Sequence, residues 1–454
     1  MCLGRGNERS RGLPPAGPTV TRDPRLTSRV PWNPSCGCVL DRDLARRCDV
    51  SGTTFGLPEK NWRPVLSGFA PSVFEHRGRL GLPYRPHTPS RILPPRGRAG
   101  WRGIERRAMA DERDPGAASG SATDHPARLR WAVNTERWSP SGDHEGAEFG
   151  FLLSLLPRHE REECLKFVHM PDKKRALVSR LLQRAACARV TSAPHASIEI
   201  RRTKGRKPFL ASPLPDPALA PNFNFNVSHE GDFVVLASEP VAVCGVDVAA
   251  PGQARRRRRD GWKPSIDEML KVFANVLTPN ERAAVENAAG DDEAKEDVFR
   301  RHWSLKEALV KAMGVGLAMD LNRADFECED EGAGVRLAGT AVPRGRLPGG
   351  VETATLRLDG EPKTRWRFFM QPLGVRASEN GGGRHWVTVS RGPFEDVTDA
   401  NGEFSATWRR VDFTDEEWAE AVDAPSPPFS TITVSDLVPE HLRGDFEEAG
   451  GDVY

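Results

Sequence analysis

The sequence predicts an α+β fold of two similar-sized halves within residues 125–395. Two observations predict it. Segments with helical or strand periodicity occur in the order strand–helix–strands, followed by helices–strands. The two runs meet near residue 240, where Glu239-Pro240 separates two strand-like stretches. The sequence shows no clear repeat between the halves, so the division depends on the order of elements alone.

The segments that flank these halves have a different composition. Residues 1–108 are rich in Arg, Pro and Gly, poor in acids and without sustained periodicity, so we predict disorder over 1–124. This extension is either a genuine segment, such as an organelle-targeting sequence, or a mis-called start upstream of Met109. Residues 396–454 are acidic and irregular, and we expect a loosely attached tail.

The first half, residues 125–240, combines one helical region with short strands. Helical periodicity runs through residues 149–190. A basic loop, KGRKP, follows the second predicted strand. Stretches rich in β-branched and aromatic residues predict single strands at 127–138, 196–203, 223–238 and, across Glu239-Pro240, 241–249.

The second half, residues 241–395, begins with that last strand and a charged insert. Thr278 is a suitable N-cap for a helix with Pro279 at its first position. Helices are predicted at 265–277, 278–288 and 299–317. Strands separated by Gly/Pro turns are predicted at 324–330, 334–339, 353–360, 365–373 and 385–392.

Composition excludes several classes of protein. The formal net charge of +2 over 454 residues gives no reason to expect a nucleic-acid or membrane partner. No apolar run approaches the roughly 18–20 residues that span a bilayer, so we expect a soluble protein. The eight cysteines form no CxxC pair and no zinc-finger spacing, which predicts reduced thiols and a cytoplasmic protein.

The helix predicted at 299–317 carries a possible site. Trp303, Glu307 and Lys311 are spaced four residues apart and therefore share one face. They are either a core anchor with a solvated ion pair, or parts of a site. Lys306 is a second cation that points roughly 100° away from Glu307.

Asp247, in the apolar strand GVDVAAP, is a second candidate. A buried carboxylate needs a cation, a hydrogen-bond donor or a place at the strand end, where it would simply cap a turn. Oxygen ligands from a strand aspartate and a helical glutamate suit Mg²⁺, which substrate phosphates and water would further coordinate.

A third cluster is basic. RRTKGRKP (201–208) places five cations around a glycine, which suits phosphate oxygens, although such loops are usually solvated. Ser228 and His229 end a strand, where a histidine is usually structural. Together the three clusters are the parts of phosphoryl-type transfer. The chain has no Walker A loop and no kinase glycine loop.

KGRKP, FNFNVSHEGD, GVDV and WSLKEALVKAMGVGL, in this order, resemble segments of the Sfp-type 4′-phosphopantetheinyl transferases, in their eukaryotic, aminoadipate-semialdehyde dehydrogenase-phosphopantetheinyl transferase-like branch. The resemblance covers roughly 127–392 and is specific for the GxD and WxxKEAxxK motifs as a set. It implies two pseudo-symmetric α+β halves with coenzyme A between them and Mg²⁺ as cofactor. It also implies a holo-[acyl-carrier-protein] synthase, in which the serine of an apo acyl or peptidyl carrier attacks the phosphate bearing the pantetheine arm and 3′,5′-ADP leaves.

The resemblance also implies roles for individual residues. Asp247 and Glu307 would hold Mg²⁺, and Glu307 would take the proton from the attacking serine, either directly or through a metal-bound water. Lys311 would neutralise charge on the transferring phosphate or the leaving group. The remaining residues would contact coenzyme A, the first three through phosphates and the last three at the nucleotide end: Ser228, His229, Lys306, Arg202, Lys204 and Lys207.

Two positions depart from the family pattern. Many relatives carry an acid two residues after the GxD aspartate, where this chain has Ala249, so water would replace one metal ligand. Many relatives also place an arginine where this chain has Pro171, and Lys173, Lys174 or Arg175 would have to supply that cation.

The run Arg255–Arg259 is an addition to the pattern. A solvated loop is the simpler interpretation, and a docking patch for acidic carrier proteins is the alternative. A nucleic-acid-binding protein that uses this run and the basic N-terminus is another function to test, as is an inactive coenzyme A-binding homologue. We expect a monomer without nucleic-acid or membrane partners. The acceptor stays open among fatty-acid synthase, polyketide synthase and aminoadipate reductase carriers, that is, between fatty acid biosynthesis and lysine biosynthesis via aminoadipate.

Overall fold

A computed structural model of the chain describes residues 125–256, 261–328, 336–337, 340–341, 351–374 and 384–452. The disorder predicted for 1–124 and the arginines at 257–259 lie outside these residues. The predicted α+β class is confirmed, because helices cover two separate β-sheets. Among the described helices, none combines the length and apolar character that a membrane crossing requires.

Sheet 1 belongs mainly to the first half. Its strand order is β14-β1-β5-β4, with β14 parallel to β1 and the other pairs antiparallel. The segment predicted as one strand at 223–238 is instead a hairpin, because Gly231 turns the chain with a φ of 56°. The strands are β1 (Arg130–Asn134), β4 (Asn224–Glu230), β5 (Phe233–Glu239) and β14 (Ser430–Thr431).

Three helices cover one face of sheet 1: α1 (Ala147–Ser154), α2 (Arg158–Leu165) and α3 (Met170–Thr191). They replace the single helical region predicted at 149–190. Pro157 and Pro171 lie at the starts of α2 and α3, where a missing N–H costs no helical hydrogen bond. Apolar side chains of these helices and of sheet 1 form the first core.

Sheet 2 belongs to the second half and has the order β11-β10-β12-β13-β6, with β7 also paired to β10. All its pairs are antiparallel. Its strands are β6 (Val243–Ala249), β7 (Ala324–Cys328), β10 (Glu352–Leu358), β11 (Glu361–Pro362), β12 (Arg367–Leu373) and β13 (His385–Gly392).

The helices of the second half are α4 (Ile266–Val272), α5 (Pro279–Asn287) and α6 (Asp292–Met313). Thr278 caps α5 as predicted, in a capping box with Glu281. Helix α6 lies against β6 and β13. Gly245 permits this approach, because a Cβ there would lie 2.1 Å from the carbonyl oxygen of Ala308.

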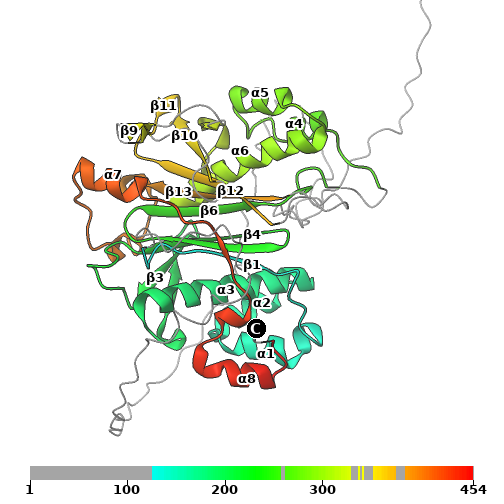
Figure 1. The fold of residues 1–454 in the computed structure, drawn as a ribbon, viewed down its shortest axis with the longest axis vertical. Coiled ribbons are helices and arrows are strands. Elements are labelled where there is room, and N and C mark those ends of the chain that lie inside the picture. The colour runs from blue at the N-terminus through cyan, green and yellow to red at the C-terminus, as the bar shows by residue number, and fades with distance from the viewer. Residues whose placement is uncertain are drawn as a thin grey trace, which may run out of the picture. The chain divides into compact units, whose positions relative to one another are not determined.

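The two sheets pack face to face through a third core. Cys244, Val246 and Val248 of β6 contribute one side of it, and strands β1 and β5 contribute the other. Figure 1 shows the resulting layers, with α1–α3 outside sheet 1 and α4–α6 outside sheet 2. Because side chains alternate along a strand, Gly245, Asp247 and Ala249 face α6 instead.

Polar side chains of β4 complete the hydrogen bonding of β6, which ends sheet 2 in the described structure. Every second residue of β4 accepts a main-chain N–H from β6 or the residue after it. The pairs are Asn224 with Cys244 at 2.7 Å, Asn226 with Val246 at 3.0 Å, Ser228 with Val248 at 3.4 Å and Glu230 with Ala250 at 2.6 Å. We call this the β4–β6 ladder. It fixes the two halves in register.

Two smaller pairs of strands complete the fold, and one of them carries the basic loop. Strands β2 (Glu199–Arg202) and β3 (Pro208–Ser212) are antiparallel, and the loop connects them. Strands β8 (Arg336–Leu337) and β9 (Thr340–Ala341) form the other pair. Short 3₁₀ helices lie at Asp143–Glu145, His195–Ser197, Gly316–Ala318, Leu321–Arg323, Phe394–Asp396, Ser405–Thr407, Ser435–Leu437 and Glu440–Leu442.

The C-terminal tail is irregular, but it is not loosely attached, and that expectation was wrong. Helix α7 (Asp415–Asp423) places Trp418 in the core of the second half. Strand β14 then joins sheet 1, and helix α8 (Arg443–Glu448) places Phe446 in the core of the first half. Apolar residues that are spaced through this acidic segment therefore attach it to the two cores. Burial of their surface holds the tail across both halves.

Candidate active site

The carboxylates of Asp247 and Glu307 lie in one buried environment between β6 and α6. Each residue is 4% exposed. Glu307 lies in the C-terminal third of α6, one residue before Ala308, whose carbonyl oxygen lies close to Gly245. The negative charge of Asp247 acts directly on Glu307. The two acids are remote in the chain, and the structure brings them close enough for their charges to interact.

Asp247 holds hydrogen bonds on one of its two oxygens. Its Oδ1 accepts from Lys311 Nζ at 2.6 Å and from Ser228 Oγ at 2.9 Å. Its Oδ2 is buried and has no hydrogen-bond partner. Burial raises the pKa of Asp247, and the bonds from Lys311 and Ser228 oppose that shift. One carboxylate oxygen is thus left without the donor or cation that burial requires.

The carboxylate of Glu307 also has too little positive charge near it to offset its burial. Burial raises its pKa to about 8, with further contributions from the negative charges of Asp247 and Glu230, against which Lys311 acts. A group titrating near neutral pH in a buried site is typical of acid–base catalysis and of ligands to a cation.

Glu230 is a third carboxylate of this cluster, and the sequence analysis missed it. It ends β4, and its Oε2 accepts from Ala250 N as the last rung of the β4–β6 ladder. Burial raises its pKa to about 7, and Asp247 adds to the shift. The signal was the alternation of polar residues at 224, 226, 228 and 230 in an otherwise apolar strand, which indicates one polar face.

Lys311 forms an ion pair with Asp247, and it comes from the same face of α6 as Glu307. Besides Asp247, its Nζ contacts Ser228 Oγ at 2.8 Å. Ser228 therefore braces Asp247 and Lys311 together. The predicted four-residue spacing does bring Glu307 and Lys311 to one place, but Lys311 forms its ion pair with the strand aspartate.

His229 lies next to Ser228 at the edge of this cluster and is partly buried. Burial lowers its pKa to about 4, and the positive charges of Arg175 and Lys311 lower it further. The imidazole is therefore neutral near pH 7 and can donate a hydrogen bond but adds no charge. An anion bound beside it would meet those two cations.

The basic loop divides into exposed and buried cations. Arg202 and Lys204 are exposed. Lys207 is buried, and its Nζ donates to the main-chain oxygens of Cys244 at 2.5 Å and Lys311 at 3.1 Å. A Cβ on Gly205 would lie 1.9 Å from the carbonyl oxygen of Gly314, so the loop packs tightly on the end of α6. Lys207 therefore joins the halves and does not face solvent with the other two.

Lys306 and Trp303 also belong to the interior. Lys306 is fully buried, and its Nζ pairs with Glu281 at 2.8 Å and donates to two main-chain oxygens. It points away from Glu307, as its position on the helix predicted. Trp303 packs against Phe273 and Phe299. The structure thus separates both residues from the carboxylates.

The residues at the cluster fit a hard divalent cation. Asp247 contributes a buried oxygen without a partner, and Glu307 is a buried carboxylate short of positive charge. In the described part of the chain, no group of three His, Cys, Asp or Glu side chains is arranged to hold a metal ion. One or two carboxylates suffice for Mg²⁺, which binds phosphate oxygens and water in addition.

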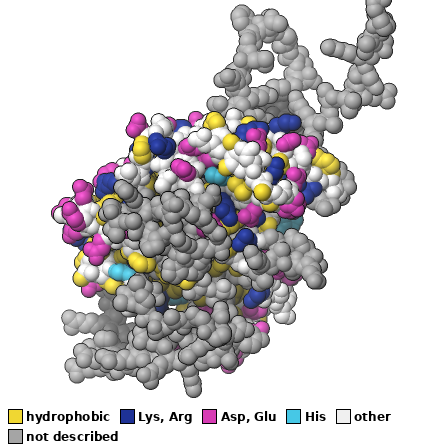
Figure 2. Space-filling view, turned by 45° about the horizontal axis from the view of Figure 1, so that its top comes forward, with side chains coloured by type: hydrophobic (Ala, Val, Ile, Leu, Met, Phe, Trp, Pro, Cys, Tyr) yellow, Lys and Arg dark blue, Asp and Glu magenta, His cyan; other side chains and the backbone are white. Residues whose placement is uncertain are grey.

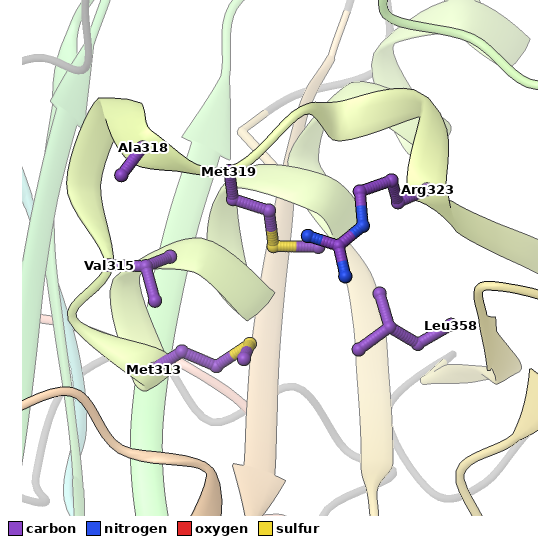
Figure 3. Close-up of a pocket in the computed structure, with 6 residues that line it drawn as sticks. All are labelled: Met313, Val315, Ala318, Met319, Arg323 and Leu358. Atoms are coloured by element: carbon purple, nitrogen blue, oxygen red, sulfur yellow. The ribbon is translucent and has the colours of Figure 1, made fainter.

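A separate hollow of about 140 Å³ lies beyond the C-terminal end of α6 (Figure 3). Its lining is mostly apolar, and none of the predicted site residues contributes to it. The one charged lining residue, Arg323, pairs with Asp359. The side chains that line the hollow are Met313, Val315, Ala318, Met319, Arg323 and Leu358.

Arg255, the first residue of the arginine run, has a structural role. Arg255 is buried and bonds to Asp292 and to the carbonyl oxygen of Pro264. Figure 2 shows basic and acidic side chains interspersed among the coloured residues of the face in view. The described residues of that face form no extended surface of one sign for a polyanion.

Comparison with known proteins relates both halves to one family. Residues 136–241 match the family described as 4′-phosphopantetheinyl transferase, N-terminal. Residues 243–371 match the 4′-phosphopantetheinyl transferase superfamily. The two regions contain every candidate site residue named above.

Several curated proteins are similar over most of their length. An L-aminoadipate-semialdehyde dehydrogenase-phosphopantetheinyl transferase of Mus musculus is 34% identical over 244 residues, which are 53% of this chain and 69% of the relative. A phosphopantetheinyl transferase of Thraustochytrium is 31% identical over 302 residues, 65% of this chain and 89% of the relative. A 4′-phosphopantetheinyl transferase of Bacillus subtilis is 28% identical over 183 residues, 40% of this chain and 70% of the relative. These matches do not support a nucleic-acid-binding protein.

Proposed function

This chain belongs to the 4′-phosphopantetheinyl transferase superfamily, and we propose how its own residues carry out the reaction. It is a transferase that moves the 4′-phosphopantetheine arm of coenzyme A to carrier proteins. The observation that carries the residue assignment is the buried cluster of Asp247, Glu307 and Lys311 in the second half, which Ser228 of the first half contacts.

Mg²⁺ is the proposed cofactor, held by Asp247 and Glu307. When bound, it would neutralise charge on the diphosphate of coenzyme A and polarise the phosphorus that is attacked. The partnerless Oδ2 of Asp247 and the raised pKa of Glu307 support this assignment. Glu230 adds a third negative charge beside them, which compensates for the absence of an acid at Ala249.

Glu307 is the proposed general base. The hydroxyl oxygen of the carrier serine attacks the phosphate that bears the pantetheine arm, its proton passes to Glu307, and the P–O bond to 3′,5′-ADP breaks. A carboxylate with a pKa near 8 accepts a proton more readily than an ordinary glutamate. The ammonium of Lys311, which pairs with Asp247, would also stabilise negative charge on the transferring phosphate.

Coenzyme A is proposed to extend from this cluster toward the basic loop. Ser228 orients Asp247 and Lys311, and the neutral His229 donates to a phosphate. Arg202 and Lys204 are exposed and would contact the nucleotide end. We assign Lys207 and Lys306 to the support of the main chain, because their ammonium groups already bond to buried oxygens.

The acceptor and the setting are part of the proposal. The name of the Mus musculus relative favours the carrier of an aminoadipate-semialdehyde dehydrogenase, among other carriers, as substrate. We propose action as a monomer, because one chain supplies both walls of the cluster. The cytoplasm is the proposed compartment, since Cys164, Cys187 and Cys244 are buried thiols without disulfides.

The test is transfer to a panel of apo-carriers from fluorescent coenzyme A. We expect covalent labelling of at least one carrier with Mg²⁺, and loss of labelling with EDTA that added Mg²⁺ reverses. Replacing the acceptor serine by alanine in the same carrier is the control for labelling at other sites. Labelling that persists unchanged in EDTA would contradict the assignment of a metal.

A further inference from the structure

Arg175 connects α3 to the tip of the β4–β5 hairpin, next to the proposed site. Its Nη1 donates to the carbonyl oxygen of Gly231 at 2.9 Å, and its Nη2 contacts the carboxylate of Asp172 at 2.6 Å. Its side chain is 19% exposed. The guanidinium is therefore held in one orientation by two contacts while part of it still reaches solvent. A guanidinium carries five N–H donors, so these two contacts leave others available.

Three cations act on the imidazole of His229 near Arg175, and each of them is paired with an acid. The charge of Arg175 and that of Lys311 both act on the imidazole of His229, from two different elements of the fold. Arg180, also on α3, acts on the same imidazole and bonds to Glu163. Asp172 is the acid that bonds to Arg175. Of these cations, Arg175 acts most strongly on the imidazole, so an anion bound beside His229 would be attracted chiefly to its guanidinium.

The other two cations at the start of α3 have different surroundings. Lys173 is buried. Lys174 lies over the ring of Trp138, with its Nζ 5.8 Å from the centroid, and Glu136 acts on it. Of the three residues that could replace the cation missing at Pro171, Arg175 is the one whose charge reaches His229.

We propose that Arg175 binds a phosphate group of coenzyme A together with His229. Guanidinium groups bind phosphate oxygens through paired N–H donors, and this one is already oriented. Residues 171 and 175 are one helical turn apart on α3, so they lie on the same face of the helix. Arg175 would thus supply from one turn further along the cation that Pro171 cannot. This inference rests on the proposed function, since it assigns a further contact with its donor substrate.

The test compares Arg175→Ala and Arg175→Lys with the wild-type chain and with Lys174→Ala as the matched control. The KM for coenzyme A and kcat are measured separately at saturating apo-carrier. We expect Arg175→Ala to raise the KM about 10- to 100-fold, the range for one charged hydrogen bond, with a smaller change in kcat. Arg175→Lys keeps the positive charge and should raise the KM for coenzyme A less than Arg175→Ala does. Lys174→Ala should match the wild type.

Two further measurements separate binding from a displaced hairpin. Pro171→Arg in the Arg175→Ala background should restore most of the KM, because it returns a guanidinium to the same helix face without the bond to Gly231. The same variants are assayed with 3′-dephospho-coenzyme A. A defect confined to coenzyme A assigns the 3′-phosphate, and an equal defect with both donors assigns the diphosphate.

An unchanged KM in Arg175→Ala would overturn the inference, as would a defect that appears in kcat and that Pro171→Arg does not restore. Absence of transfer by the wild-type chain is a different result. It would contradict the proposed function itself, before any variant is compared.

Discussion

Two buried clusters of charge lie where the halves meet, and they differ in their balance of charge. At one cluster, Glu239 at the end of β5 is paired with Arg128, Arg130 and Arg391. At the other, Asp247, Glu307 and Glu230 share the ammonium of Lys311 as their nearest described cation. Both clusters connect the halves. Arg391 of sheet 2 pairs with Glu239 of sheet 1, and Ser228 of sheet 1 donates to Asp247 of sheet 2.

The different balance of charge shifts the pKa values of the carboxylates in opposite directions in the two clusters. Burial alone would raise the pKa of Glu239, but Arg391, Arg130 and Arg128 lower it to about 2. Burial raises the pKa of Glu307 to about 8, and neighbouring carboxylates add to the shift. A buried carboxylate that is paired with several cations, such as Glu239, needs no further ligand and holds the two halves together. A buried acid with too few cations leaves a site for a ligand that brings positive charge.

The largest effect is expected from Glu307→Gln. Transfer should fall by roughly 10²- to 10⁴-fold, because the variant loses a proton acceptor as well as a ligand. Its thermal midpoint should be equal to that of the wild type or higher, since a destabilised buried charge is removed. Single-turnover labelling of an apo-carrier and thermal melting measure the two effects.

Glu281→Gln is the matched control, because Glu281 is another buried carboxylate that pairs with a lysine of α6. It should lower the thermal midpoint and leave the transfer rate per folded molecule near that of the wild type. A Glu307→Gln protein that labels carriers at the wild-type rate would show that this residue is not the base.

The structural cluster should show the reverse pattern. Glu239→Gln leaves three buried arginines without their carboxylate, and we expect the free energy of unfolding to fall by about 3–5 kcal/mol. The kcat of the protein that remains folded should change little. Urea unfolding followed by tryptophan fluorescence measures the loss. Glu162→Gln, which breaks an exposed pair with Arg158, should leave the unfolding midpoint unchanged.

The smallest effect is the pH dependence of stability without Mg²⁺. Between pH 4.5, the ordinary pKa of a glutamate, and about 8, folded Glu307 retains a proton that the unfolded chain has lost. Stability from this group should therefore decrease as pH rises through that window.

Thermal midpoints of the wild type and of Glu307→Gln, measured from pH 5 to pH 8.5, test this sign. The wild-type midpoint should decline more steeply, and saturating Mg²⁺ should remove the difference. For Glu239 the stabilisation should be lost in the opposite direction, as pH falls from 4.5 toward 2. If the thermal midpoints of the wild type and of Glu307→Gln changed in parallel with pH, the account of Glu307 would be wrong.

Local patterns predicted much of the fold because they depend on neighbours in the chain. The capping box at Thr278 and the helix through Glu307 follow from capping and periodicity. The hairpin at Gly231 was predicted as one strand, since its turn consists only of Gly231 and its neighbours. The tail was misjudged because its composition is acidic, although single apolar residues anchor it.

The residue types and spacing in the sequence alone determined the α+β class, the helix that carries Glu307 and Lys311, and the strand that carries Asp247. Which lysines face the cluster was decided only by the tertiary structure, which turned Lys207 and Lys306 toward buried oxygens and brought Glu230 beside Glu307. The physical reason is that periodicity assigns a side chain to a face, whereas its pairing and its pKa depend on groups from other elements.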